Sequence, residues 1–175
     1  MNIKGKKVLL RAVEEKDLKQ LLEIINDENI EKMLGGFSFP ISQKDQVNWY
    51  NNLKNATNQL RCVIDVNDSC IGMIVLSDID YKNGTAEIHI KLINSMINRR
   101  KGYGYDSLKT ILLYGFQELR LNCIYSNVLE YNTPSQNLFK KLGFKQEGIL
   151  RERIYKNNQY NNLLSFSIKA GELID

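Results

Sequence analysis

Two spacings of hydrophobic residues divide the chain into helices and strands. A three-to-four-residue spacing, typical of amphipathic helices, predicts four helices: residues 14–27, 42–55, 105–119 and 134–142. Short apolar or alternating runs between turn residues predict seven strands: residues 7–13, 60–66, 70–78, 85–92, 122–129, 144–155 and 160–169. Strands before, between and after the helices predict an α+β fold.

Short polar sequences mark several turns and helix ends. The segments 67–69, 83–84 and 157–158 have the Asn-rich or Gly-containing sequences of tight turns between strands. Ser42 is typical of a helix N-cap, and Gly143 is typical of the residue that ends a helix. Because these turns join consecutive strands, we expect a mixed, mostly antiparallel sheet flanked by helices.

The composition is that of one soluble domain. The chain has 175 residues, of which 43% are hydrophobic and 25% charged, so we expect a single domain over residues 1–175. No apolar run reaches the length of a membrane span, and residues 1–7 lack the apolar run of a signal peptide. Cys62, Cys70 and Cys123 form no Cys-x-x-Cys pair, so we expect reduced thiols in a cytoplasmic protein without a metal site.

The charge distribution favours one anionic ligand over a nucleic acid. The net charge is +4, and lysine and arginine are scattered apart from residues 99–101 and the Lys140-Lys141 pair. A nucleic-acid-binding protein would show a continuous basic face. Two local clusters suit the phosphates of a single cofactor, so we expect neither a nucleic-acid nor a membrane partner.

The sequence Arg-Arg-Lys-Gly-Tyr-Gly at residues 99–104 lies between a predicted strand and a predicted helix. Two glycines one residue apart allow a sharp turn and a close approach of backbone N–H groups to a ligand. The helix that follows directs its unpaired N–H groups and the positive end of its dipole at the same point, which suits a pyrophosphate. The segment matches neither a dinucleotide fingerprint, which would need glycine at Ser107, nor a P-loop. An ordinary surface turn is the alternative for the segment alone.

A second motif follows about thirty residues further on, and it reads Asn132-x-x-Ser135-x-x-x-Phe139-x-x-x-Gly143-Phe144. It resembles the second cofactor motif of the Gcn5-related N-acetyltransferase (GNAT) superfamily, apart from Phe139. Arg99-x-x-Gly102-x-Gly104 is similar to the acetyl-CoA loop of the same superfamily. Residues 147–160 resemble the subgroup that contains RimJ/RimL-type, spermidine and amino-sugar N-acetyltransferases. The resemblance covers nearly the whole chain.

The resemblance implies an acetyl-CoA-dependent N-acetyltransferase with a splayed pair of central strands. The pantetheine arm would lie in the gap between them and bond unpaired backbone groups near Ile90–Leu92, one of which would polarise the thioester carbonyl. The residues implied in binding acetyl-CoA are Ile90, Lys91, Leu92, Arg99, Arg100, Lys101, Gly102, Tyr103, Gly104, Tyr105, Asn132, Ser135, Phe139 and Lys141.

The strand before the glycine loop carries the candidate base. Alternation predicts that Glu87, His89 and Lys91 share one face of this strand. An alkylamine has a pKa of roughly 10, so a base or water must take its proton at neutral pH. Glu87 is the first candidate, with a salt-bridged structural carboxylate as the alternative. His89, the one histidine of the chain, is the second candidate and is otherwise structural.

The acid position departs from the family pattern. Many members have a tyrosine where this chain has Phe139, and phenylalanine cannot protonate the departing thiolate. Ser135, predicted here as a catalytic residue, or Tyr131 could replace it, or the thiolate could leave without a dedicated acid. Asn132 and Ser135 have a second interpretation as cofactor-binding residues and a third as simple helix caps.

The acceptor is the part of the function that the motifs specify least. The segment 33–39 lacks acidic residues, which argues against a polyamine and favours a small-molecule or amino-sugar amine. Aromatic residues that could stack on a sugar are Phe37, Phe39, Trp49 and Tyr81, although Trp49 also suits a core position. The alternatives are a protein N-terminus, a polyamine, or a CoA-binding module without catalysis, and the sequence also allows a homodimer.

Overall fold

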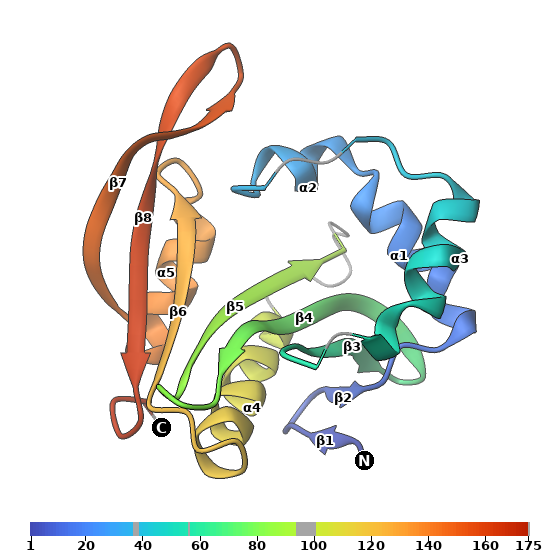
Figure 1. Cartoon of the computed structure of the whole chain (residues 1–175), viewed down its shortest axis with the longest axis horizontal. Helices are drawn as coiled ribbons and strands as arrows, with labels where there is room; N and C mark the ends of the chain where they lie inside the picture. Colours follow the sequence, from blue (N-terminus) through green and yellow to red (C-terminus); the bar gives the residue numbers. More distant parts are fainter. Residues whose placement is uncertain (37–38, 56, 94–100, 175) are drawn as a thin grey trace.

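A computed structural model describes residues 1–175 except 37–38, 56, 94–100 and 175 (Figure 1). The strands are β1 (Ile3–Lys4), β2 (Leu9–Arg11), β3 (Leu60–Val66), β4 (Ser69–Asp80), β5 (Thr85–Leu92), β6 (Cys123–Leu129), β7 (Lys145–Lys156) and β8 (Gln159–Lys169). The helices are α1 (Leu18–Ile25), α2 (Glu28–Lys32), α3 (Gln43–Asn51), α4 (Tyr103–Gln117) and α5 (Thr133–Leu142), with short 3-10 turns at Glu15–Asp17 and Leu53–Asn55.

The described strands form one sheet in the order β1-β2-β3-β4-β5-β6-β8-β7. Every neighbouring pair is antiparallel except β5 and β6, which are parallel. This confirms the predicted α+β class and the mixed, mostly antiparallel sheet. The sheet has one strand more than the sequence pattern predicts, because the two-residue β1 is too short to give a periodic signal.

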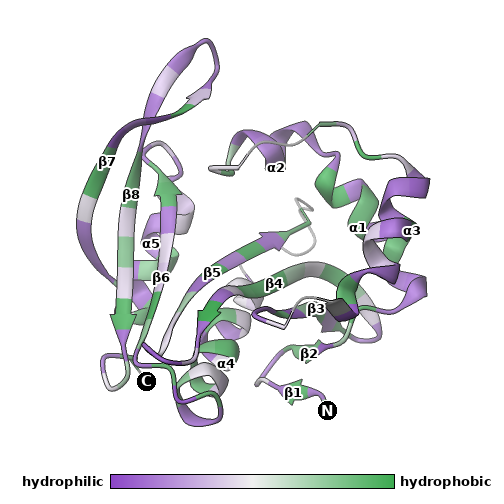
Figure 2. Ribbon diagram, viewed as in Figure 1, coloured by the Kyte–Doolittle hydropathy of each residue, from purple (hydrophilic) through white to green (hydrophobic). Residues whose placement is uncertain are grey.

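Helices cover both faces of the sheet. Leu108, Ile111 and Leu112 of α4 lie in one core cluster with the inner strands and α5, whereas Leu21 and Ile24 of α1 lie in a second cluster on the other face. Figure 2 shows hydrophobic residues along β4 and hydrophilic residues around the tip of the β7–β8 hairpin. The two clusters fix the central strands between helices and leave that hairpin tip outside the core.

Local capping explains where the observed helices depart from the predicted ones. The predicted helix 14–27 ends at Ile25, and the Asp27 carboxylate then accepts hydrogen bonds from the N–H groups of Asn29 and Ile30 and begins α2. The apolar residues of the segment 42–55 predict a buried face formed by Val47 and residues 50–53. Tyr50 and Leu53 pack against the second core cluster as predicted, but Val47 is 45% exposed and Gln46 is buried instead. The polar α3 lies on the surface, where Trp49 and Tyr50 pack against the second cluster, called here the α1 cluster.

The predicted turns and caps are present. Ser42 caps α3 through a reciprocal pair of contacts with Asp45, and Gly143 ends α5 with a φ of 104°. Asn157 and Asn158, between β7 and β8, have φ values of 54° and 59°, the left-handed geometry of a two-residue hairpin. Because each of these devices acts over a few residues, the local sequence was sufficient to predict them.

The strands β5 and β6 separate halfway along their length. They pair only from Thr85 opposite Cys123 to Glu87 opposite Tyr125. Beyond Glu87, β5 stays paired with β4 as far as Leu92, while β6 stays paired with β8 as far as Leu129. The parallel partners therefore diverge, as Figure 1 shows, and the sheet opens at its centre.

Candidate active site

The glycine loop begins a helix, as predicted. Gly102 is the N-cap of α4 with a φ of 81°, and its carbonyl accepts the hydrogen bond of the Asp106 N–H. The amides of Tyr103, Gly104 and Tyr105 precede this first helical bond and are the N–H groups that a helix leaves for a ligand. Lys101 is exposed beside them. Arg99 and Arg100, predicted to belong to this site, lie outside the described residues.

Gly104 has a packing role that the sequence did not indicate. A Cβ atom at this position would lie 3.1 Å from Leu92 Cδ1 and 3.4 Å from Leu138 Cδ2. The missing side chain therefore lets the first turn of α4 approach the end of β5 and the helix α5. Any substitution of Gly104 would change this packing as well as the loop.

Lys7 is a basic residue of this site that sequence reasoning missed. Its Nζ donates a hydrogen bond of 2.8 Å to the carbonyl of Lys101, next to Gly102. The buried Asp106 carboxylate holds the turn that carries Lys7, because it accepts hydrogen bonds from the N–H groups of Lys6, Lys7 and Val8. Nothing in the local sequence around Lys7 signals this contact, which joins residues almost a hundred positions apart.

Tyr105 and Lys141, both predicted to bind the cofactor, lie together at the start of α4 and the end of α5. The Lys141 Nζ is 5.1 Å from the centre of the Tyr105 ring, within the range of a cation–π contact. Tyr103 is partly buried against the main core cluster. Lys141 of α5 thus lies beside the first turn of α4, which follows the glycine loop.

The N-terminus of α5 is fixed by Asn132. Its side-chain oxygen accepts from the Ser135 N–H, and its Nδ2 donates a hydrogen bond of 2.8 Å to the carbonyl of Met33. The helix-cap interpretation of Asn132 is therefore confirmed. The Ser135 hydroxyl makes no hydrogen bond within the described part of the chain, and this side chain faces a cavity.

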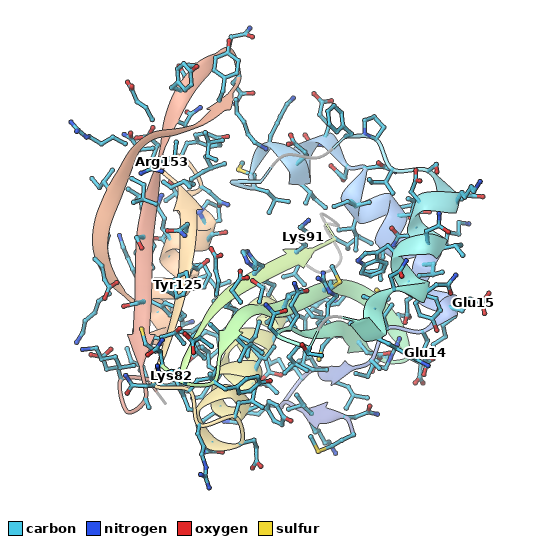
Figure 3. The ribbon with its side chains drawn as sticks, viewed as in Figure 1. Glu14, Glu15, Lys82, Lys91, Tyr125 and Arg153 are labelled. Atoms are coloured by element: carbon cyan, nitrogen blue, oxygen red, sulfur yellow. The ribbon has the colours of Figure 1, made fainter. Side chains whose placement is uncertain are left out.

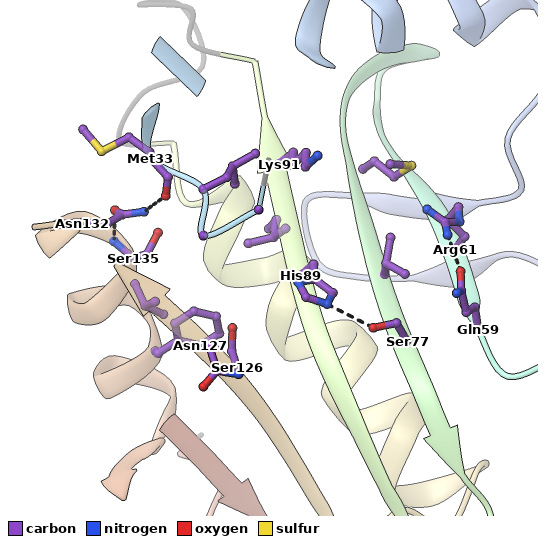
Figure 4. Close-up of a pocket in the computed structure, with 18 residues that line it drawn as sticks. Met33, Gln59, Arg61, Ser77, His89, Lys91, Ser126, Asn127, Asn132 and Ser135 are labelled. Atoms are coloured by element: carbon purple, nitrogen blue, oxygen red, sulfur yellow. Dashed lines mark hydrogen bonds between the residues drawn. The ribbon is translucent and has the colours of Figure 1, made fainter. Parts of the chain in front are cut away.

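The cavity occupies the opening between β5 and β6 and has a volume of about 400 Å³. One wall is formed by residues 126–128 of β6, by Asn132, the N-cap of α5, and by Ser135 and Phe139 of α5. The opposite wall is formed by residues 89–91 of β5 and by side chains of β3 and β4 (Figure 4). The loop 33–36 closes one side. The volume lies within the range of small-molecule sites.

Three long-range hydrogen bonds hold the segment that closes the cavity. The carbonyls of Glu31, Lys32 and Met33 accept from Lys156 Nζ, the Tyr131 hydroxyl and Asn132 Nδ2 respectively. Lys156 also pairs with the Glu31 carboxylate at 2.5 Å, and this lysine is buried. The tip of the β7–β8 hairpin and the start of α5 thereby position α2 and the loop after it.

The backbone of β5 presents hydrogen-bonding groups to the opening. The Ile93 N–H donates a hydrogen bond to the carbonyl of Ile71, which belongs to β4. Every second residue of an antiparallel strand bonds the same neighbour, so the backbone N–H and C=O groups of Lys91, His89 and Glu87 also bond β4. The N–H and C=O groups of Ile90 and Leu92 consequently face β6, which has already diverged. Lys91 contributes its side chain to the cavity while its backbone pairs with Met73. It lies toward the free end of β5, away from the paired region near Tyr125 (Figure 3).

Glu87 and His89 share one face of β5, as predicted, and form a polar network. His89 Nε2 is 3.6 Å from Glu87 Oε2 and 3.0 Å from Ser77 Oγ. Asn127 Nδ2 donates to Glu87 Oε1. The contact with His89 holds the pKa of Glu87 below its ordinary value, although burial acts to raise it. His89 lines the cavity, whereas Glu87 lies behind it at the last paired position of β5.

Asn127 is a further residue of the site that the motifs did not reveal. It lines the cavity, and its Oδ1 atom is buried with no hydrogen-bond partner in the described residues. A buried amide oxygen without a partner is costly. A ligand N–H at this point would satisfy it, so the orphaned oxygen fits an amide- or amine-bearing ligand in the opening.

Phe139 and Tyr131 offer no acid to the cavity. The Phe139 ring is buried, with ring centroids 4.8 Å from Phe144 and 6.4 Å from Phe166. The Tyr131 hydroxyl donates a 2.6 Å hydrogen bond to the Lys32 carbonyl, so the hydroxyl proton is not directed at the cavity. Burial of Cys62 raises the pKa of its thiol to about 11, so this cysteine is not a nucleophile at neutral pH.

The aromatic residues considered for sugar stacking that the structure describes do not line the cavity. Phe39 and Tyr81 are 71% and 64% exposed and are not among the lining residues. Trp49 is partly buried against the α1 cluster, with the Arg61 guanidinium 5.7 Å from its ring centre. Phe37 lies outside the described residues. The wall formed by β3, β4 and β5 is lined by polar and charged side chains together with Met73 and Val75.

Comparison with known proteins identifies the family. The family model of the acetyltransferase (GNAT) domain matches residues 7–145 of the sequence. These residues span both motifs and the strands β5 and β6. The chain belongs to the GNAT family of acetyltransferases. This GNAT enzyme is 27% identical over 168 residues to an uncharacterized N-acetyltransferase of Bacillus subtilis derived from the SPbeta prophage, with 96% of this chain and 93% of that protein covered.

Spermidine acetyltransferases are also similar to this GNAT enzyme. The spermidine N(1)-acetyltransferase of Vibrio cholerae is 30% identical over 156 residues, with 88% of each chain covered. A crystal structure of spermidine N-acetyltransferase from Vibrio cholerae in complex with CoA and spermine aligns with a TM-score of 0.87 and 25% identity, covering 96% of this chain and 98% of that one. These similarities support the GNAT fold and acetyl transfer to an amine.

Proposed function

We propose that this enzyme transfers the acetyl group of acetyl-CoA to a primary amine of a small molecule or amino sugar within the cavity between β5 and β6. The observation that carries the proposal is the divergence of the two strands after Glu87. It creates a cavity of about 400 Å³ with the N-terminus of α5 on one wall and free backbone groups of β5 on the other.

The residues along this path fit acetyl-CoA. The amides of Tyr103, Gly104 and Tyr105, together with Lys7 and Lys101, supply an electropositive cradle for the pyrophosphate. Ile90 and Leu92 would bond the pantetheine amides through their free N–H and C=O groups. Lys91, Asn132, Ser135, Phe139 and Lys141 complete the binding residues that we propose, together with Arg99 and Arg100.

Three groups of the chain would support the chemical step. The Ile90 N–H, which faces the opening, would donate to the thioester carbonyl and stabilise the charge that develops on its oxygen. Glu87 would act as the general base, receiving the amine proton directly or through His89, which lies between it and the cavity. Asn127 would orient the pair through its hydrogen bond to Glu87.

The thiolate leaves without a dedicated side-chain acid in this proposal. Phe139 has no proton to donate and the Tyr131 proton is engaged by the Lys32 carbonyl. A thiol has an ordinary pKa of roughly 8.5, so its anion is a tolerable leaving group near neutral pH. Ser135, in the first turn of α5, would bind the cofactor, and the helix N-terminus would stabilise the departing negative charge.

Replacing Ser135 by alanine is expected to raise the Michaelis constant for acetyl-CoA roughly tenfold with little change in turnover, as for a lost binding contact. Phe139→Tyr is expected to leave turnover near that of the unmodified enzyme. Steady-state rates at saturating and limiting acetyl-CoA measure both quantities. A fall in turnover of roughly 10²–10⁴-fold at saturation would instead identify Ser135 as the acid.

The cavity favours a small acceptor over the competing functions. The loop 33–36, which Asn132 holds in place, closes one side of the cavity, and this restriction suits a small molecule better than a protein N-terminus. The similarity to spermidine acetyltransferases keeps a polyamine as an alternative acceptor. A CoA-binding module without catalysis is the alternative from another class, because Phe139 replaces the usual tyrosine.

Two measurements test the proposed function. Isothermal titration calorimetry with acetyl-CoA measures cofactor binding, and release of the free CoA thiol measures turnover over amino sugars, amino acids, peptides and polyamines. We expect binding and turnover with a small-molecule amine. Absence of acetyl-CoA binding would refute the proposal, and binding without turnover on any amine would favour the non-catalytic module.

We propose a cytoplasmic enzyme that requires no metal and binds neither nucleic acid nor a membrane, and a homodimer remains compatible with it. In the part of the chain that the structure describes, no helix is long and apolar enough to cross a membrane. Sedimentation of the purified protein would measure its oligomeric state.

A further inference from the structure

One wall of the cavity is cationic. Arg61 of β3 and Lys91 of β5 both line it, together with Gln59 and His89 (Figure 4). None of the lining residues that the structure describes is an aspartate or a glutamate. The Lys91 side chain extends toward the side on which Arg61 and Gln59 lie (Figure 4). The charge of this wall is therefore positive and is not balanced from within the cavity.

Arg61 is held in place by neutral partners. Its guanidinium donates a hydrogen bond to the side-chain oxygen of Gln59 and packs over the Trp49 ring at 5.7 Å. It forms no ion pair within the described ranges of the chain. A guanidinium that is fixed by stacking and lacks a carboxylate partner is suited to bind an anion with two parallel hydrogen bonds.

Lys91 carries a largely desolvated ammonium that has no ion-pair partner among the residues that the structure describes. Burial lowers its pKa, and the nearby charge of Arg61 lowers it further. Among the described residues, the acidic group that acts to raise the pKa of Lys91 is the Glu31 carboxylate. This carboxylate is already paired with Lys156 at 2.5 Å. Two like charges beside one partly buried cavity are unfavourable unless an anion lies between them.

Resting on the proposed function, we propose that the acceptor amine carries an anionic group, a carboxylate or a phosphate, which Arg61 and Lys91 bind. A polyamine would bring further positive charge to this wall, where like charges repel. An anion would instead neutralise both cations and gain charge-assisted hydrogen bonds. The site thus selects acceptors by charge as well as by the presence of an amine.

The sheet register limits the size of this acceptor. Arg61 is opposite Val75, and Val75 is opposite His89, so two strand spacings separate Arg61 from His89. That separation is roughly 10 Å between backbones. An amine directed at the acetyl group near His89 and an anion at Arg61 must fit within this distance. Compact amino acids and phosphorylated amino sugars meet the requirement.

Matched pairs of acceptors test the proposal on the unmodified enzyme. Thiol release at saturating acetyl-CoA is measured with glucosamine 6-phosphate against glucosamine, with leucine against leucinamide, and with spermidine. We expect kcat/KM to be at least about tenfold higher for the anionic member of one pair. The first pair reports a phosphate and the second a carboxylate. This inference would be overturned if glucosamine, leucinamide or spermidine were acetylated with a kcat/KM equal to or above that of both anionic acceptors. The proposed acetyltransferase function would still hold in that case.

Charge-removing variants locate the effect. Arg61→Gln and Lys91→Met are each expected to reduce the preference for the anionic acceptor about tenfold, chiefly through the KM of that acceptor. Acetyl-CoA affinity is expected to change less in Arg61→Gln, because Arg61 is not among the residues proposed to bind the cofactor. Lys44→Met, on the exposed surface of α3, is the matched control and should keep the preference unchanged. An undiminished preference in both cavity variants would exclude Arg61 and Lys91 as the anion site.

Discussion

Replacing Gly102 by valine is expected to lower the affinity for acetyl-CoA by about 100-fold or more. Gly102 begins α4 with a φ of 81°, a backbone conformation that a β-branched residue adopts only at a cost of roughly 1–2 kcal/mol. Relaxation of that strain would turn the first amides of α4 away from the pyrophosphate. Loss of two charge-assisted hydrogen bonds, each about 1.5–3 kcal/mol, corresponds to a loss of this size.

Calorimetric titration with acetyl-CoA measures the effect, and Gly171→Val is the matched control. Gly171 also has a left-handed φ, of 93°, and a Cβ atom there would meet no other atom within 4 Å. Both variants should lose a similar amount of thermal stability, but only Gly102→Val should lose affinity. Unchanged binding in Gly102→Val would show that the loop is an ordinary turn. Gly104→Val is a less specific test, because the new side chain would also press on Leu92 and Leu138.

Replacing Glu87 by glutamine is expected to lower turnover by roughly 10²–10⁴-fold, the usual contribution of a general base. The contact with His89 keeps the pKa of Glu87 below its ordinary value, so its carboxylate is charged throughout the neutral range. The fraction of Glu87 that is ionised, and can therefore accept a proton, stays constant across that pH range. The fraction of neutral amine rises as the pH approaches the amine pKa, so the defect of Glu87→Gln should shrink as pH rises.

Turnover of Glu87→Gln and His89→Gln across neutral and alkaline pH distinguishes a direct base from a relay. If Glu87 acts through His89, both variants should show the same pH-dependent defect. If Glu87 acts alone, His89→Gln should retain most of the turnover. Glu118→Gln, at the exposed end of α4, controls for the loss of one carboxylate. A full rate in Glu87→Gln would show that this residue is only a structural partner of His89 and Asn127.

The caps and turns could be predicted because each depends on a few neighbouring residues. Ser42 with Asp45, Gly143 after α5 and the Asn157-Asn158 turn satisfy backbone groups or adopt left-handed angles within their own segment. The same is true of the glycine loop, where Gly102 supplies the backbone angle that α4 needs at its start. The alternation that places Glu87, His89 and Lys91 on one face is likewise a local property of a strand.

One position of the buried face of α3 was predicted wrongly, because the surroundings of the helix decided which residues it buries. Tyr50 and Leu53 pack against the second core cluster as the pattern predicts, whereas Val47 is exposed and Trp49 packs there as well. Periodicity of so few apolar residues defines a face only loosely. The rotation of such a helix is therefore set by the partner on which it packs.

The sequence by itself determined four of the helices, seven of the strands, the glycine loop and the α5 motif, since each is encoded by spacing within one segment. Only the tertiary structure brought Lys7 to Lys101, Asn127 to Glu87, and Arg61 into the same cavity as Lys91. These contacts join residues that lie far apart along the chain, and they arise from strand register and from the divergence of β5 and β6. The charge of the acceptor wall is therefore a property of the folded sheet, because no single segment contains both of its cations.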